Sequence, residues 1–194
     1  MKKKSTLIII AVIAVLAMWG ISSYNGLVEQ EESVKQVWGN VESSYQRRAD
    51  LIPNLVSVVK GYAKHEENTL KEVIEARSKA TAVTINADDL NEETMKKFQD
   101  AQSQVGSALS RLMVVAEQYP ELKANENYAK TMDAVNTYEN QVRMSRMTYN
   151  DTVTKYNKEI RQFPPSLVAG VLGFSTREYL NEAVGKTEMP SMKI

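Results

Sequence analysis

The chain has 194 residues, a formal net charge of +0 at pH 7, one histidine and no cysteine. Its balanced charge provides no overall positive field to attract nucleic acid, so we expect no nucleic-acid partner. The lack of cysteine excludes disulfides, thiolate nucleophiles and zinc–thiolate sites.

The N-terminal segment has the composition of a membrane-inserted helix. Its only charged side chains up to residue 28 are those of Lys2–Lys4, and residues 5–28 are uncharged, with a nearly continuous apolar run over residues 7–19. A membrane-spanning helix needs about 20 apolar residues, whereas the apolar region of a signal peptide has roughly 7–15. The run lies between these lengths and reaches spanning length when residues 20–24 are included.

Two interpretations of this segment are open. It is either an uncleaved anchor or a signal peptide cleaved near Val15-Leu16-Ala17, which resembles a small-residue cleavage site. We favour the anchor because the uncharged stretch continues about ten residues beyond that site. Basic residues mark the cytoplasmic side of a span, and here lysines precede it while the first charges after it, from Glu29, are acidic. We therefore expect residues 5–24 to cross the bilayer, with the N-terminus in the cytoplasm.

After the anchor, apolar residues recur at steps of three and four, as along one face of a helix in a bundle. The first stripe covers residues 34–62. We expect a bend near Asp50–Pro53, where the proline either kinks one long helix or lies in the first turn of a new helix capped by Asp50. A break at Gly61–His65 precedes a second helical stripe over residues 70–80.

The second half of the chain predicts two further helices. Residues 81–89 are expected to form a loop, and Asp89 with Glu92 has the spacing of a capping box at the start of a third helix. That helix ends at Tyr119-Pro120, and a tight connection leads to the longest helix, which ends before Pro164-Pro165.

The C-terminal residues carry weaker signals. Residues 166–174 are apolar but too short to span a membrane, so we expect them to pack across the end of the bundle. The last residues, 187–194, are expected to be loose. Within the longest helix, Tyr149-Asn150 and Tyr156-Asn157 are one heptad apart and so lie on the same side, as in a coiled coil.

Together these patterns predict an all-α protein with an N-terminal transmembrane helix followed by an antiparallel bundle of about four long helices. The expected division is a basic tip and signal-anchor over residues 1–28, the helical bundle over residues 29–165, and a C-terminal segment over residues 166–194 that is partly packed and then flexible.

The sequence offers little for catalysis or metal binding. His65-Glu66 begins like a zinc-protease motif, but the second histidine ligand would have to stand where Thr69 is. The acidic loop over residues 86–92 lacks the central glycine and the terminal glutamate of a calcium loop. We therefore expect no catalytic residue, no metal and no other cofactor.

Charged residues also stand on the apolar stripes, namely Arg48, Arg77, Glu139 and Arg146. In one interpretation their aliphatic stems pack while the charged heads reach solvent. In the other they form a buried layer of ion pairs and hydrogen bonds that fixes helix register, for example Glu139 with an arginine of the first helix. The sequence leaves both interpretations open.

Several blocks of the sequence resemble the LemA family of bacterial membrane-anchored helical proteins. The densest is Gln46-Arg47-Arg48-Ala49-Asp50-Leu51-Ile52-Pro53-Asn54-Leu55-Val56, and further blocks lie at residues 117–124 and 146–150. The ordered blocks cover residues 24–164, and the segment after Phe163 is the least family-like part. The resemblance implies a single N-terminal membrane span and a helical, bundle-like domain. Together with the charges that flank the span, it leads us to expect a location in the bacterial inner (cell) membrane, with the helical domain on the outer, extracytoplasmic side. It implies no catalytic activity.

The leading hypothesis is a non-enzymatic envelope protein that presents its bundle to a protein partner, either an envelope metallopeptidase, as the resemblance suggests, or a second copy of itself. The alternatives are a hydrolase that uses His65 and Glu66, and a helical adaptor of a transport system. The residues expected to matter most for structure and interaction lie around the bend and on the helix facing it: Arg47, Arg48, Asp50, Pro53 and Asn54, with Glu139, Asn140, Arg146 and Tyr149.

Overall fold

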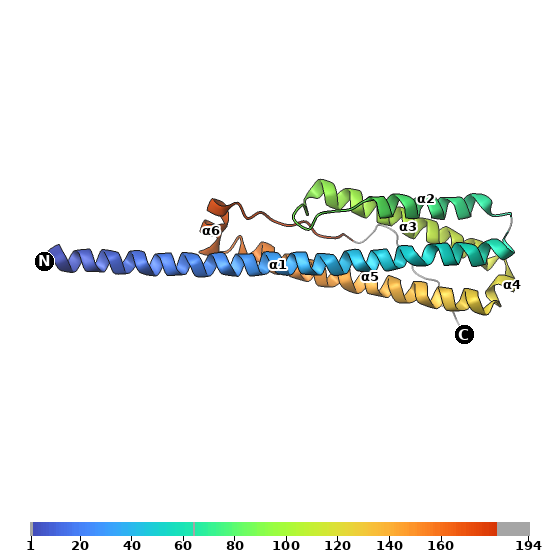
Figure 1. Ribbon diagram of the computed structural model, residues 1–194, viewed down its shortest axis with the longest axis horizontal. Helices are drawn as coiled ribbons and strands as arrows, with labels where there is room; N and C mark the ends of the chain where they lie inside the picture. The colour runs from blue at the N-terminus through green and yellow to red at the C-terminus, as the bar shows by residue number, and fades with distance from the viewer. Residues whose placement is uncertain (1, 64, 182–194) are drawn as a thin grey trace.

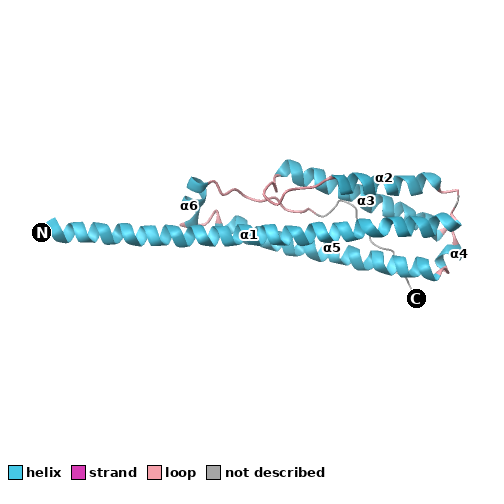
Figure 2. Ribbon diagram, viewed as in Figure 1, coloured by secondary structure: helices cyan, strands magenta, loops and turns pink. Residues whose placement is uncertain are grey.

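The computed structural model describes residues 2–63 and 65–181, so the prediction for residues 187–194 lies outside the described residues. The elements in chain order are α1 (Lys2–Tyr62), α2 (Glu67–Ala82), α3 (Glu92–Glu117), α4 (Pro120–Lys123), α5 (Glu126–Glu159) and α6 (Pro165–Leu172). These ranges contain no strand (Figure 2). The predicted all-α class with one apolar N-terminal helix is confirmed.

Helix α1 is the axis of the molecule. Figure 1 shows α2, α3 and α5 alongside its C-terminal half, whereas its N-terminal part extends beyond them alone. The most extensive helix contacts join α1 to α5 and α2 to α3, so the packed region consists of two helix pairs laid on each other.

The size of the buried side chains matches this pairing. Alanines are buried on α2 and α3, at Ala76, Ala80, Ala101 and Ala108, and they let these two helices approach closely. Between the pairs the space is filled by aromatic rings. Phe98 of α3 meets Trp38 and Tyr45 of α1 in edge-to-face contacts, with ring centroids 5.2 and 5.0 Å apart.

The N-terminal part of α1 leaves its apolar side chains uncovered. The large apolar side chains from Leu7 to Met18 are each 52–67% exposed, and the first fully buried residue of the helix is Leu27. Among the described helices, α1 is the one that is long and apolar enough to cross a membrane. The segment predicted as an anchor therefore continues, without a break in the helix, into residues 34–59 of α1, which form part of the packed core.

Most predicted helix boundaries agree with the structure, with one correction. α1 ends at Tyr62 and α2 begins at Glu67, which confirms the break at residues 61–65. The loop before α3 is shifted to residues 83–91, and the prediction that Asp89 caps α3 is wrong. The cap is Asn91, whose side chain accepts a hydrogen bond from the backbone N–H of Thr94, while Asp89 accepts one from the Asn91 amide. Asparagine and aspartate cap equally well, so composition alone could not separate these neighbours.

The expected bend at Asp50–Pro53 is also corrected. α1 runs through Pro53 as one helix, Asp50 does not cap a new helix, and Figure 1 shows no sharp bend there. Proline has no N–H, so the carbonyl of Ala49, four residues earlier, loses its helical hydrogen bond. The Nε–H of Arg77 on α2 donates to that carbonyl at 2.9 Å and replaces the missing donor.

Beyond α5 the chain turns back along the molecule. α6 packs against α1 at the end of α5, as expected for residues 166–174 (Figure 1). Residues 174–181 then run without helical structure back along the bundle, and Leu180 is buried in its core.

The pairing of Arg77 with the proline-freed carbonyl predicts a coupling between Pro53 and Arg77. In the full chain in detergent, Arg77→Met should lower the free energy of unfolding by about 1 kcal/mol, because Ala49 loses its replacement donor. In a Pro53→Ala background the new N–H at position 53 bonds to Ala49, so the same substitution should cost almost nothing. Urea unfolding followed by circular dichroism measures both costs, and equal costs in the two backgrounds would contradict the pairing.

Candidate functional site

A polar layer divides the hydrophobic core into two clusters. The proximal cluster lies on the anchor side and is built around Trp38 and Tyr149. The distal cluster lies toward the α1–α2 connection and is built around Leu55 and Leu109. At the level where the two meet, α1, α3 and α5 each contribute a polar side chain instead of an apolar one.

Arg48 of α1 is the centre of this layer, and it is 5% exposed. One guanidinium nitrogen lies 3.1 Å from a carboxylate oxygen of Glu139 on α5. The other donates to the side-chain oxygen of Gln102 on α3 at 2.7 Å and to the Gln102 backbone carbonyl at 3.3 Å. The guanidinium carbon also lies 4.9 Å from the centre of the Tyr45 ring, a cation–π distance. One arginine thus joins three helices.

The polar layer is open to water at Glu139 and closed to it at Arg48. The Glu139 side chain is 42% exposed, so water reaches its carboxylate, while Arg48 is held inside with its charge compensated by Glu139 and Gln102. Burial raises the pKa of the neighbouring Tyr45 hydroxyl, and the charge of Arg48 opposes that rise. Such a layer specifies how helices align, since any other register would leave the buried charge unpaired.

The structure separates the remaining predicted site residues. Arg47, Pro53, Asn54 and Asn140 are exposed and do not join the layer. Asp50 is also exposed and lies 3.8 Å from Arg77, at the margin of an ion pair. Of the two interpretations of the charged stripe residues, the buried layer describes Arg48 with Glu139.

Arg146 and Tyr149 belong to a different arrangement, a clamp on the C-terminal segment. The Tyr149 hydroxyl donates to the backbone carbonyl of Glu178 at 2.9 Å, and burial raises the pKa of that hydroxyl. A guanidinium nitrogen of Arg146 donates to the carbonyl of Asn181.

Two asparagines of α5 form the centre of the clamp. Asn157 accepts from the backbone N–H of Arg177 at 2.8 Å and donates to its carbonyl at 2.9 Å. Asn150 does the same to Leu180, at 2.9 and 2.8 Å. Each side-chain amide thus pairs with both polar groups of one backbone residue, as a neighbouring β-strand would. We call Asn150, Asn157 and Tyr149 the asparagine clamp.

The clamp explains the heptad echo in the sequence. Asn150 and Asn157 lie on the same side of α5 because they are seven residues apart, and this spacing matches three residues of extended chain, from Arg177 to Leu180. The repeat is visible in the sequence, but nothing in the sequence indicates what it binds. Residues 177–181 were missed because they lack the apolar periodicity that marks a packed element.

Charged residues close the proximal end of the bundle. A guanidinium nitrogen of Arg177 bonds to the Glu31 carboxylate, and another donates to the backbone carbonyl of Asp88 at 3.3 Å. Lys35 lies 2.7 Å from the Asp88 carboxylate and 2.8 Å from that of Glu32. These contacts join α1, the loop before α3 and the C-terminal segment at the level where the first acidic residues follow the apolar part of α1.

Hydrogen bonds to the two carboxylates, that of Asp88 first, raise the pKa of Lys35, and the bond to Lys35 lowers the pKa of Asp88. The lowered pKa of Asp88 means that this contact contributes fully above the ordinary carboxyl pKa and is lost as the pH falls through the lowered value. The raised pKa of Lys35 means that its contribution is lost only when the pH rises beyond the ordinary lysine pKa.

The residues of the alternative hydrolase site lie at the far end of the bundle. His65 is exposed, and Glu66 is 3.4 Å from the hydroxyl of Tyr119. Within residues 2–63 and 65–181, no three histidine, aspartate or glutamate side chains are grouped as metal ligands. The geometry does not bring His65 to a second catalytic group.

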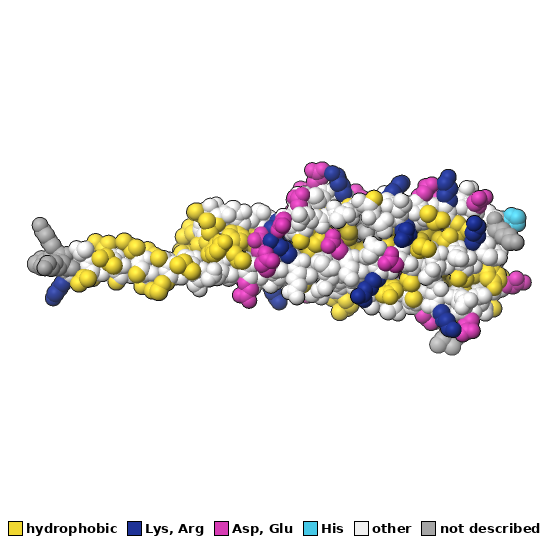
Figure 3. All heavy atoms as spheres, viewed as in Figure 1, with side chains coloured by type: hydrophobic (Ala, Val, Ile, Leu, Met, Phe, Trp, Pro, Cys, Tyr) yellow, Lys and Arg dark blue, Asp and Glu magenta, His cyan; other side chains and the backbone are white. Residues whose placement is uncertain are grey.

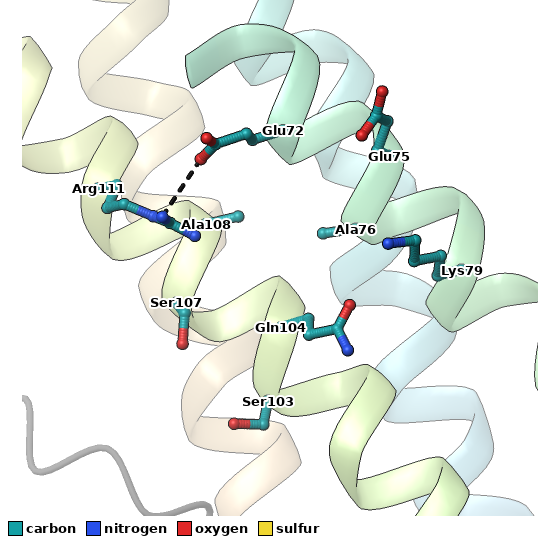
Figure 4. A pocket seen from close by; sticks show the side chains of 9 residues that line it. All are labelled: Glu72, Glu75, Ala76, Lys79, Ser103, Gln104, Ser107, Ala108 and Arg111. Atoms are coloured by element: carbon teal, nitrogen blue, oxygen red, sulfur yellow. Dashed lines mark ion pairs between the residues drawn. The ribbon is translucent and has the colours of Figure 1, made fainter. Parts of the chain in front are cut away.

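A groove of about 350 Å³ lies between α2 and α3 (Figure 4). Ala76 and Ala108 face each other across it, and polar or charged residues surround them. Glu72 and Arg111 form an ion pair over the groove at 3.4 Å, with side chains 50% and 63% exposed. Exposed pairs of this kind contribute little stability, and the groove is a solvated polar surface rather than an enclosed reaction site.

Comparison with known proteins agrees with the resemblance found in the sequence. The sequence model of the LemA family matches residues 37–193. The match begins later than the first family-like block at residue 24, and it includes the C-terminal segment, which we expected to be the least family-like part. The clamp gives a physical reason, because residues 177–181 belong to the same packed unit as α5.

Individual relatives are similar over most of the chain. The magnetosome proteins MamQ 1 and MamQ 2 of Paramagnetospirillum magneticum are each 28% identical over 195 residues, which cover 92% of this chain and 70% of the relative. The magnetosome protein MamQ of Magnetospirillum gryphiswaldense is 28% identical over 196 residues, with the same shares. Protein LemA of Metamycoplasma hominis is 25% identical over 145 residues, or 75% of this chain and 63% of that protein.

The polar layer predicts that two adjacent arginines differ sharply in importance. Arg48→Met should lower the free energy of unfolding by about 2–3 kcal/mol, because Gln102 and Glu139 lose their shared partner. The matched change Arg47→Met should cost less than about 0.5 kcal/mol, because Arg47 is exposed. Urea unfolding of the full chain in detergent, followed by Trp38 fluorescence in a Trp19→Phe background, measures both. Equal losses for the two variants would rule out the layer.

The asparagine clamp predicts that its loss releases the C-terminal segment while the helices persist. Asn157→Ala removes two hydrogen bonds to Arg177, and at about 1 kcal/mol for each bond the open population should rise about tenfold or more. Trypsin cleavage after Arg177, detected by mass spectrometry, should accelerate accordingly, since cleavage follows the open population. The control Asn140→Ala, exposed on the same helix, should cleave at the parent rate. Unchanged cleavage of the Asn157 variant would show that the clamp does not hold the segment.

Proposed function

The chain belongs to the LemA family, and we propose from this premise and from its structure that it is a non-enzymatic, membrane-anchored envelope protein that presents an antiparallel four-helix bundle to a protein partner. The observation that carries the proposal is the continuity of α1. One helix is uncovered and apolar over residues 7–18 and forms the packed core over residues 34–59. A domain built on the anchor helix itself is held at a fixed height and direction above the bilayer.

The proposed orientation follows from the charges at the two ends of the apolar segment. Three lysines precede it, and the acidic residues Glu29, Glu31 and Glu32 follow it. By the positive-inside rule the N-terminus lies in the cytoplasm and the bundle outside the inner membrane. In this arrangement α4 and the C-terminal end of α1 form the tip farthest from the bilayer (Figure 1).

Exposed apolar side chains on the bundle support the proposal that it binds a protein partner. Met144 and Met147 are 60% and 55% exposed and lie one turn apart on α5, and Val114 of α3 is 64% exposed. Methionine side chains adapt to different binding surfaces, so Met144 and Met147 are the main apolar groups of the proposed contact. The proposed partner that covers these apolar side chains is a second protein, either an envelope metallopeptidase or another copy of this chain. The MamQ relatives are named as magnetosome proteins.

A cross-linking experiment in intact cells tests orientation and partner together. The native chain has no cysteine, so single cysteines can be placed at Met147, Val114 and, as a charged exposed control, Lys96, with Lys2→Cys reporting the N-terminus. A membrane-impermeant maleimide carrying a photoreactive group should label all positions except 2 from outside. Photolysis should give a discrete protein adduct at Met147 or Val114 and none at Lys96.

Two outcomes would contradict the proposal. Labelling at position 2 with none at the bundle positions would reverse the orientation. Efficient labelling without an adduct at either apolar position, together with loss of cellular function in His65→Ala, would favour the hydrolase alternative.

A further inference from the structure

The segment from Phe163 to Leu172 is an unusual surface for a helical domain in water. Four of its apolar side chains are largely exposed: Phe163 at 79%, Leu167 at 57%, Val171 at 83% and Leu172 at 55%. A helix that covers a domain normally turns polar residues outward. Here the buried residue is the small Ala169, and the outward face of α6 is the apolar one.

The sequence around this face carries no charge. Between Arg161 and Arg177 every residue is uncharged, and α6 itself has neither an acidic nor a basic side chain. Both arginines stand at the ends of the stretch, and Arg177 is already bonded to Glu31 on α1. The uncharged stretch therefore ends on each side at an arginine, whose charged side chain stays hydrated.

The position of α6 along α1 identifies what lies against it. A bilayer's hydrocarbon core is crossed by about 20 helical residues, so a span that starts at residue 5 ends near Tyr24. The ring of Tyr24 meets that of Phe174, just after α6, at a centroid distance of 6.1 Å. α1 becomes partly covered at Trp19 and Gly20, and it is fully buried at Leu27. α6 thus lies beside the outer end of the span.

The distribution of charged side chains agrees with the placement of α6 beside the outer end of the span. Figure 3 shows the hydrophobic side chains of α1 and of the α6 region at the same end of the molecule, with acidic and basic side chains beginning directly beyond them. Glu31, Lys35 and Arg177 belong to that first charged level. Figure 1 shows α6 running across α1 rather than along it, the direction of a helix that lies in the plane of a membrane surface.

We propose that the segment Phe163–Leu172 is a second membrane contact, which inserts Phe163, Leu167 and Val171 into the outer-leaflet boundary between headgroups and acyl chains. The inference rests on the proposed anchoring by α1 and adds a lipid-binding surface to it. α6 has 8 residues and cannot span the bilayer, so it binds in the interface. Two contacts, one across the membrane and one on it, fix the rotation of the bundle about α1 as well as its height.

Depth-dependent quenching tests this contact in the full chain. Single cysteines at Val171, Leu16 and Val114 carry an environment-sensitive nitrobenzoxadiazole dye, and the protein is reconstituted in vesicles of phosphatidylethanolamine and phosphatidylglycerol. A fraction of the lipid carries a nitroxide, near the top of the acyl chain in one sample and near its end in a second. The expected result is loss of fluorescence at position 171 with the shallow nitroxide, loss at position 16 with the deep one, and none at position 114 with either; Val114 is also apolar, at 64% exposed, but lies on the bundle.

The three labelled positions distinguish the proposed anchoring by α1 from the proposed interfacial contact of α6. Quenching at position 16 without quenching at position 171 would overturn the interfacial contact and leave the anchor intact. No quenching at either position would overturn both. Leu167→Asp, added to the Val171→Cys variant, should reduce quenching at position 171 because a carboxylate resists dehydration, while circular dichroism stays unchanged. If the aspartate has no effect on quenching, the contact does not depend on the apolar face of α6 and the proposal fails.

Discussion

The pairing of Arg48 with Glu139 and Gln102 is the constraint on which the rest of the bundle depends. An arginine cannot lose its charge in a protein, so a buried one must find acceptors wherever the helices align. A shift of α3 or α5 by one turn, about 5.4 Å, would carry Gln102 or Glu139 out of reach. The leucine, valine and alanine positions of the stripes discriminate weakly against such a shift, because these residues repeat along them. The buried charge, together with the edge-to-face contacts of Phe98 with Trp38 and Tyr45, selects one register.

An arginine of a neighbouring helix compensates for the proline within α1. Arg77 of α2 supplies the donor that Pro53 lacks. Because the freed carbonyl of Ala49 is satisfied from outside the helix, the proline ends neither the helix nor its apolar stripe, and Ile52 and Leu55 remain buried beyond it. A helix without a hinge transmits any tilt of its apolar N-terminal part directly to the bundle, and the proposed role as a membrane-anchored scaffold depends on this mechanical link.

The sequence predicted the features that rest on periodicity and missed those that rest on single hydrogen bonds. Steps of three and four residues placed the helices and the break after Tyr62. Charges on the apolar stripes offered Glu139 opposite an arginine of the first helix as one of two open interpretations. The cap of α3 went to Asp89 instead of Asn91 because both residue types cap helices. The bend at Pro53 was expected because the compensating Arg77 lies on another helix. Residues 177–181 have no pattern at all, and their place is set by the side chains of Asn150 and Asn157.

The dependence of residues 177–181 on Asn150 and Asn157 connects the two ends of the chain. The uncharged stretch before Arg177 makes limited apolar contact with the bundle: Ala169 is the buried residue of α6, and Val168 and Phe174 pack partly buried against the core. The segment after this stretch fixes the position of the stretch further. That segment is bonded to α5 through Asn157 and Asn150, and to α1 through the ion pair of Arg177 with Glu31. Because these bonds lie at the charged level just beyond the apolar part of α1, they leave α6 on the anchor side with its apolar face outward. The asparagines of α5 thereby determine which side chains meet the membrane.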